Sequence, residues 1–355
     1  MSSRAALPSL LWFSQRTAES LAGASAGWLL SGLSQAPLVN GLLPAVNAAT
    51  TLLPLRPRAR LGMALQLCGL LLLLAVALKR LGPSPAWPLV ASGLVGLGRT
   101  ASLLPLQRWL LAARHLSLVW LQRLGDAGGL SGSLLTALLY PLLRNTAPQF
   151  AMAALLLLPG LLLVSSPRFR PPATSSPVSP VSPVAASGLD LRGGAQGLLF
   201  GALFALLPLW VRTIGRGDCV DFGLVLAAYG LGRILALPLP LPGWSLYAAM
   251  ALLLQATTWL PAWGSTALFV PLGALAAGSD GRLAASLTAG EGEGSVGAAE
   301  GLARIDRSLA IGSLVGSLAM GAGSQLLGLP HARILIVAAY GLAAVLLPRR
   351  HATTA

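Results

Sequence analysis

Repeated apolar runs, each long enough to cross a lipid bilayer, constrain the fold of this chain more than any other feature. Two of them, residues 61–78 and 147–165, contain no charged residue at all. A membrane-spanning helix needs about 20 mostly apolar residues. Only 10% of the 355 residues are charged, against about a quarter in a soluble domain, so polar groups could not cover the surface of a soluble fold. The sequence therefore predicts an all-α integral membrane protein.

Counting the runs predicts about twelve transmembrane helices. The first run contains Arg16 and Glu19, so eleven spans preceded by an amphipathic N-terminal helix remain an alternative. The expected spans are 8–30, 34–54, 61–78, 86–106, 127–143, 147–165, 194–213, 221–240, 244–263, 265–279, 308–328 and 331–348.

A proline- and serine-rich stretch divides the chain almost in half. Repeated prolines favour extended, water-exposed backbone, so residues 167–192 are expected to form a linker. It separates an N-terminal six-helix bundle (1–166) from a C-terminal six-helix bundle (193–355). The twelve-span arrangement puts 15 basic residues on the side of both termini and 6 on the other. By the positive-inside rule, both termini are expected in the cytoplasm, with the chain in the cell (inner or plasma) membrane.

Small residues recur at every fourth position in two corresponding spans. Residues at this spacing share one helix face and allow a neighbouring helix to approach closely. Spans 1 and 7 are therefore expected to be equivalent, and long basic connections at 106–135 and 279–317 support the same duplication. The expected helix-packing residues are Gly23, Gly27, Gly193, Gly197, Gly201, Gly312 and Gly316.

In its twelve spans, two halves and central linker, the chain resembles the major facilitator superfamily, especially its short bacterial permeases. The segments 32–62 and 96–115 resemble that family's second span with its following turn and its fourth span with its following loop. The resemblance implies two six-helix bundles that rock about a midplane cavity and move a small solute.

The family's gating motif pairs an acid with basic residues between spans 2 and 3. The chain keeps a basic remnant here, but residues 47–55 contain no acid. The corresponding turn of the second half keeps one arginine among prolines. The resemblance therefore implies that a salt-bridge latch of the usual composition cannot form. The remnant consists of Arg56, Arg58, Arg60, Gly62 and Arg233.

Ionisable residues inside predicted spans are candidate functional groups, because charge at membrane depth is costly. Arg16 and Glu19 lie three residues apart on one helix face and can pair. They either face a central cavity and bind substrate or a proton, or lie solvated at the interface. Glu19 is the only acid well inside a predicted span, so proton coupling would depend on it. Arg99 either holds an anionic group or makes a structural helix-end contact.

The remaining charged groups are assigned to loops. Arg212, Arg216, Asp218 and Asp221 are interpreted as a solvated outer turn, with a gate contact as the alternative. The acids in the second long connection are interpreted as part of a flexible polar loop. These acids are Asp280, Glu291, Glu293 and Glu300.

Enzymatic and nucleic-acid functions are not favoured. The three histidines are far apart, the two cysteines lack metal-ligand company, and no phosphate-binding glycine loop is present, so neither a metal nor another cofactor is predicted. The net charge of +14 comes from arginines scattered between apolar runs rather than from a basic stripe. The expected partners are the lipid bilayer and a small-molecule substrate, and a monomer is expected.

The sequence thus predicts a multi-pass permease. Few buried charges favour an apolar or amphipathic compound moved by efflux. Two alternatives stay open: a non-transporting scaffold or assembly factor with a transporter-like fold, and the membrane subunit of a multicomponent importer.

Overall fold

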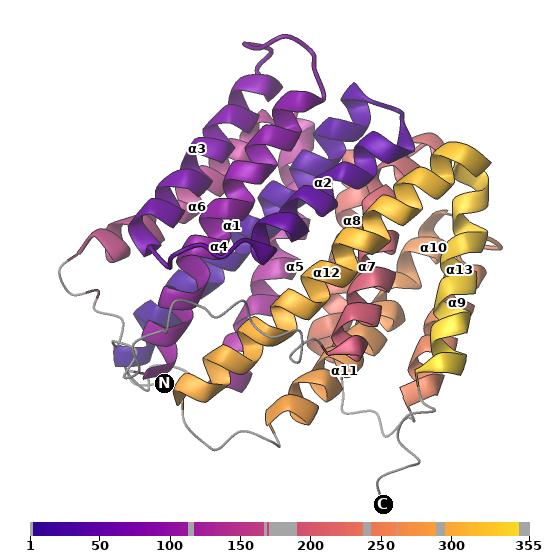
Figure 1. Cartoon of the computed structure of the whole chain (residues 1–355). Helices are drawn as coiled ribbons and strands as arrows, with labels where there is room; N and C mark the ends of the chain where they lie inside the picture. The colour runs from indigo at the N-terminus through magenta and orange to yellow at the C-terminus, as the bar shows by residue number, and fades with distance from the viewer. Residues whose placement is uncertain are drawn as a thin grey trace, which may run out of the picture.

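The computed structural model describes residues 3–112, 117–166, 169, 190–236, 243–260, 262–288 and 295–347. This described part is a bundle of helices without strands (Figure 1). The first half contains α1 (Ser3–Leu33), α2 (Pro37–Leu52), α3 (Ala59–Ala77), α4 (Ala86–Ala112), α5 (Leu118–Leu143) and α6 (Ala147–Ser165). The second contains α7 (Leu191–Thr213), α8 (Cys219–Leu235), α9 (Gly243–Ala256), α10 (Ala262–Ala267), α11 (Phe269–Thr288), α12 (Ser295–Leu327) and α13 (Leu329–Leu346).

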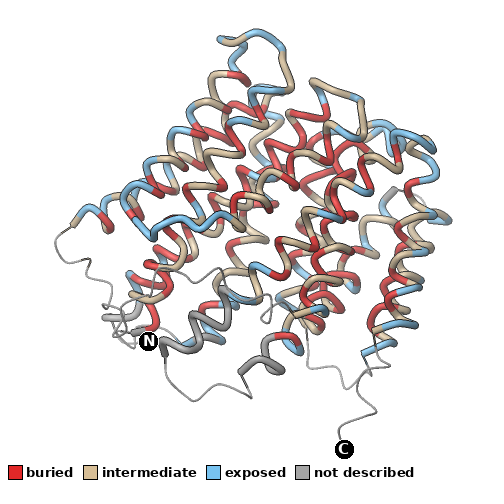
Figure 2. The backbone as a smooth tube through the Cα atoms, in the orientation of Figure 1, coloured by how far each residue is buried: buried red, intermediate tan, exposed pale blue. Residues whose placement is uncertain are grey.

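Six of these helices are long and apolar enough to cross a membrane by length and composition: α3, α4, α6, α7, α12 and α13. Large apolar side chains also point outward, among them Leu162, Leu252 and Leu326. Figure 2 shows buried residues concentrated on the inward faces of the helices, where they meet their neighbours. Apolar residues on the outer faces fit a lipid environment, so the chain is a multi-pass membrane protein.

The first helix is a continuous element inside the bundle. At about 1.5 Å per residue, its 31 residues reach about 45 Å, more than the hydrocarbon core of a bilayer. It packs against α5 and α6, and Leu21 and Leu30 are fully buried. Trp28 belongs to the hydrophobic core of the second half. A surface-lying amphipathic helix is therefore not what α1 forms, and the eleven-span alternative is wrong on this point.

The two halves repeat one packing scheme. In the first half, Gly128 and Gly132 of α5 lie against the α1 backbone; in the second, Gly312 and Gly316 of α12 lie against the α7 backbone. The contacts between the halves follow the same scheme. The second helix of each half packs on the other half, α2 on α12 and α8 on α5. These relations make the two bundles pseudo-symmetric.

The register of this repeat differs from the one expected from glycine spacing. Gly197 and Gly201 face α12, at the start of α7. Gly27 lies in the second half of α1 and contacts Pro208 of α7. A Cβ added at Gly23 would meet no neighbouring helix within 4 Å. The glycines that correspond between the two halves lie in α5 and α12, where they approach the backbone of the first helix of each half.

The two long connections are shorter than expected, because helices occupy most of them. In the second, residues 279–288 belong to α11 and residues 295–317 belong to α12. Asp280 is therefore helical, and its assignment to a flexible loop is wrong. Glu291 and Glu293 lie outside the described residues, as does most of the 167–192 linker, so the domain boundaries stay predictions.

Candidate functional site

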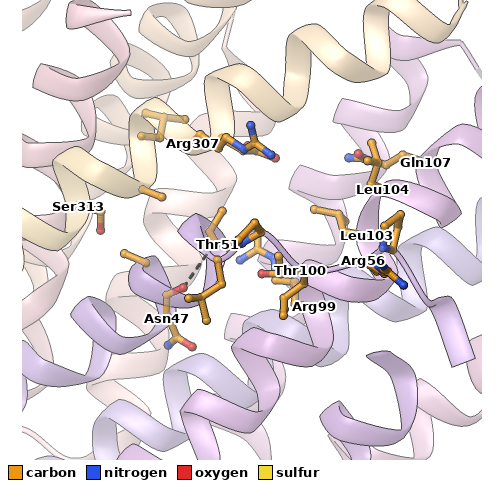
Figure 3. A pocket seen from close by; sticks show the side chains of 18 of the residues that line it. Asn47, Thr51, Arg56, Arg99, Thr100, Leu103, Leu104, Gln107, Arg307 and Ser313 are labelled. Atoms are coloured by element: carbon orange, nitrogen blue, oxygen red, sulfur yellow. Dashed lines mark hydrogen bonds between the residues drawn. The ribbon is translucent and has the colours of Figure 1, made fainter. Parts of the chain in front are cut away.

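A cavity of about 980 Å³ separates the two halves at one end of the bundle. Its walls are α2, α4 and the turn between α2 and α3 on one side, and α12 on the other (Figure 3). We name this end the Arg56 end, after a residue of that turn, and the opposite end the Arg212 end. The lining of this large cavity mixes apolar side chains, such as Leu103 and Leu309, with polar ones, such as Asn47 and Gln107.

At the Arg212 end, the halves are in close contact. A Cβ added at Gly41 of α2 would lie 2.7 Å from the carbonyl oxygen of Ser317 in α12. A Cβ added at Gly223 of α8 would lie 2.7 Å from the backbone nitrogen of Ala137 in α5. Both glycines lie near the start of their helices, so the cavity is closed on this side.

Glu19 is held by two arginines at the cavity. Its carboxylate lies 2.5 Å from Nη1 of Arg16 and 3.7 Å from Nε of Arg99. The Glu19 side chain is 9% exposed, and that of Arg99 is 45% exposed. The structure thus brings together three candidates found in the sequence and places Glu19 away from solvent. Arg99 lies in the middle of α4 rather than at its end, and it reaches a functional candidate instead of a helix terminus.

A chain of amide side chains supports this carboxylate. Gln15 donates to Glu19 and to Gln66, each at 3.0 Å, and Gln66 donates to the Ser102 hydroxyl at 2.9 Å. Buried polar groups that are hydrogen-bonded to one another hold a fixed arrangement. The network therefore fixes α1, α3 and α4 around Glu19.

A second, smaller cavity of about 290 Å³ shares Arg99, Gln107 and Asp306 with the first. Charged residues from both halves line it, among them Arg16, Asp126 and Asp280. The inner parts of the two halves thus meet at a charged region next to the large cavity.

Arg233 forms an ion bridge between the halves. Its Nε lies 2.7 Å from Asp126 of α5, and its Nη1 lies 2.6 Å from Asp280 of α11. Gln196 of α7 also donates to Asp280. The bridge does not have the usual composition of the family's latch, because its acids come from α5 and α11 rather than from the turn.

Arg212 forms a different inter-half contact at the opposite end. Its guanidinium carbon lies 3.9 Å from the centroid of the Trp28 ring. It also donates to the Ser31 hydroxyl and to the Trp28 carbonyl, both at 3.1 Å. A solvated turn does not describe Arg212, which joins α7 to α1. Asp218 and Asp221 form a capping box at the start of α8.

The basic remnant between α2 and α3 splits into separate roles. Arg56 lines the large cavity. Arg58 is exposed, and its backbone N–H donates to the Ala101 carbonyl. Arg60 donates to the Val164 and Ser165 carbonyls at the end of α6, where a cation is favourable. Gly62 lies against the α4 backbone, where a side chain would not fit.

Three acids of this region, Asp126, Asp280 and Asp306, were not among the candidate site residues predicted from the sequence. All three lie beyond the expected ends of spans, in helices that continue past their apolar stretch. Asp126 could have been found by extending the helical period of α5 backward from Gly129 and Ser133. Asp306 had no such signal, because it lies in a long polar start of α12.

These features define a multi-pass membrane protein in which two pseudo-symmetric helical bundles flank a central cavity. No protein-family model and no curated protein sequence matches the chain. Solved structures do match it along nearly its whole length. A point variant of the nucleoside transporter NupG gives a TM-score of 0.57 at 14% identity, covering 96% of each chain.

Two further structures agree. The human organic anion transporter MFSD10 (TETRAN) gives a TM-score of 0.58 at 16% identity, covering 98% of this chain and 100% of its own. A D-xylose–proton symporter gives 0.55 at 14% identity, covering 96% and 95%. The chain has the fold of major facilitator transporters.

Proposed function

We propose that this protein is a membrane transporter that moves a small amphipathic solute by alternating access between its two halves. The observation that carries the proposal is the inter-half cavity, which is open at the Arg56 end and closed at the Arg212 end. Its volume of about 980 Å³ is at the upper end of the range of small-molecule sites. The fold shared with known transporters supports the same function.

The distribution of basic residues supports an orientation of the chain in the membrane. The positive-inside rule assigns the Arg56 end to the cytoplasm. Efflux is the proposed direction, and a cavity that is open to the cytoplasm and can load solute from inside the cell is compatible with it. Opening at the other end would require the contacts at Gly41, Gly223 and Arg212 to separate.

Glu19 is the proposed site of ion coupling. It is a nearly buried acid next to the cavity, and its partners Arg16 and Arg99 lie on the same half. Protonation would release both arginines from the carboxylate and free them to contact solute. Charge at membrane depth is expected to serve such a role.

Alternating access can be tested with two single-cysteine reporters in a Cys68→Ser background, because Cys68 is exposed and Cys219 is buried. Ser313→Cys reports on the Arg56-end cavity, and Gly32→Cys reports on the Arg212 end. Solute identified by a sensitivity screen of a deletion strain should change their maleimide labelling rates in opposite directions. A static scaffold would label at the same rates with and without every solute tested.

Coupling can be tested by proton-driven uptake in vesicles. Glu19→Gln should abolish the dependence of uptake on a pH gradient while leaving facilitated exchange. Asp218→Asn is the control, since it removes an acid at the start of α8 that lines neither the large cavity nor the smaller one next to it. Unaltered coupling in Glu19→Gln would refute the role of Glu19.

A further inference from the structure

The large cavity has an excess of arginines. Arg56 and Arg99 enter it from the first half, and Arg307 enters it from α12 (Figure 3). Asp306 is the acid of its lining. The surrounding side chains are mostly apolar, including Leu103, Leu104 and Leu309 of the lining.

Pairing within the protein leaves two of these cations uncompensated. Arg99 lies next to Glu19, and together with Asp306 it lines both the large cavity and the smaller one beside it. Arg56 and Arg307 have no hydrogen-bond or ion-pair partner among the described residues. They lie on opposite walls, since one belongs to the α2–α3 turn and the other to α12.

A separate observation at the Arg212 end points the same way. A cavity of about 810 Å³ there is lined by Trp28, Tyr140 and four basic residues. These are Lys79, Arg80, Arg144 and Arg212, and its lining contains no acid among the described residues. Most of this lining belongs to the first half, and Arg212 contributes to it from the second. Positive charge therefore lines a cavity at each end of the bundle, and such charge concentrates anions.

We propose that the transported solute is an amphipathic organic anion, whose acidic group is bound between Arg56 and Arg307 while its apolar body lies against the leucines of the cavity. This assignment rests on the proposed transport function and gives its substrate class. Arginine suits the role because its planar guanidinium binds carboxylate, sulfonate or phosphate oxygens through paired hydrogen bonds.

The same geometry gives the anion a part in the movement. Closing the cavity would bring Arg56 on one wall toward Arg307 on the other, and like charges in a desolvating site repel strongly. An anion between them converts this repulsion into two attractive contacts. Closure is therefore favoured when the anion is bound and disfavoured when the cavity is empty.

Binding of naphthalene-2-sulfonate to the full chain in phosphatidylcholine nanodiscs tests the assignment. The matched cation is naphthylmethyl-trimethylammonium, which has the same ring system and the opposite charge. The wild-type protein should bind the sulfonate and not the cation. Arg56→Gln and Arg307→Gln should each weaken sulfonate binding about tenfold, since each removes a charge-assisted contact.

Arg58→Gln is the matched control, because Arg58 is an exposed arginine two residues from Arg56 that does not line the cavity. It should change the affinity by less than about twofold, because Arg58 is exposed like Arg56 but lies outside the cavity and acts on the anion only through screening solvent. Arg56→Lys keeps the charge and loses the paired hydrogen bonds, so it should bind the sulfonate more tightly than Arg56→Gln and more weakly than the wild type. Preferential binding of the cation, or equal loss in Arg58→Gln and Arg56→Gln, would overturn the assignment.

Two further measurements, competition by a lipid and uptake in proteoliposomes, distinguish failure of the anion site from failure of the transport function. Displacement of the sulfonate by phosphatidylglycerol at one lipid per protein would assign the arginines to a lipid headgroup and overturn the solute site. Arginine-dependent binding without uptake in proteoliposomes would refute transport but retain the anion site. Uptake of the cation alone would retain transport and overturn the anion.

Discussion

The two inter-half seams, α2–α12 and α8–α5, begin alike and end differently. At the Arg212 end, Gly41 packs on Gly321 of α12, and Gly223 packs in the same way on Ala137 of α5. Toward the Arg56 end, the α8–α5 seam is closed by the ion bridge of Arg233. The α2–α12 seam opens there into the large cavity.

Residue counting shows how this difference arises. Ten residues after Gly41 lies Thr51, whereas ten residues after Gly223 lies Arg233. Eleven residues before Gly321 lies Ala310, whereas eleven before Ala137 lies Asp126. The positions that form the bridge in one seam are thus a threonine and an alanine in the other, and both line the cavity. The pseudo-symmetric fold thus contains two equivalent seams. The seam with the charged pair Arg233 and Asp126 is closed, and the seam with Thr51 and Ala310 at the equivalent positions is open.

The largest effect is expected where the seams are alike. Gly41→Ala and Gly223→Ala should each lower the free energy of unfolding by about 3 kcal/mol, because the added Cβ meets backbone atoms that cannot move alone. Denaturant titration of the purified protein measures the change. Gly129→Ala of α5 is the control, since a Cβ there meets nothing within 4 Å and should be neutral or stabilising. Equal losses at Gly41 and Gly129 would contradict the packing argument.

Much of this arrangement was accessible from the sequence, and the exceptions have a common cause. Apolar runs predicted the bundle, and the pair of Arg16 with Glu19 followed from their spacing. The bridge partners of Arg233 could not be predicted, because Asp126 and Asp280 come from helices distant in sequence. Polar helix ends also resemble loops in composition. Only the fold shows that they face a cavity rather than water.

The second prediction breaks the closed seam. Arg233→Gln should lower the free energy of unfolding by about 2 kcal/mol, because it leaves two acids without their partner. The loss is smaller than for a fully buried bridge, since the arginine is 25% exposed. Adding Asp126→Asn should recover part of the loss, and a double-mutant cycle measures the coupling. Additive effects of the two changes would mean that the pairing of Arg233 with Asp126 contributes nothing.

A third, smaller effect is expected at the end that both seams share. Arg212→Gln removes the cation from the Trp28 ring and should cost about 1 kcal/mol. Thermal unfolding followed by tryptophan fluorescence measures it. Arg216→Gln, in the loop that follows α7, is the control, because the side chain of Arg216 is exposed and has no partner in the part of the chain that the structure describes. Equal shifts for the two variants would show that only net charge matters.

The smallest energetic effect should come from copying the bridge into the open seam. Thr51→Arg with Ala310→Asp places the charges of Arg233 and Asp126 at the equivalent positions, and such a partly exposed pair should contribute about 0.5 kcal/mol. Even this amount shifts a balanced open–closed equilibrium about twofold toward closure. Maleimide labelling of Ser313→Cys, in the Cys68→Ser background, should slow accordingly. Thr51→Arg with Ala310→Arg introduces like charges and should leave labelling as fast or faster. If both double variants slow labelling equally, bulk rather than charge closes the cavity, and charge at this position does not explain why the seams differ.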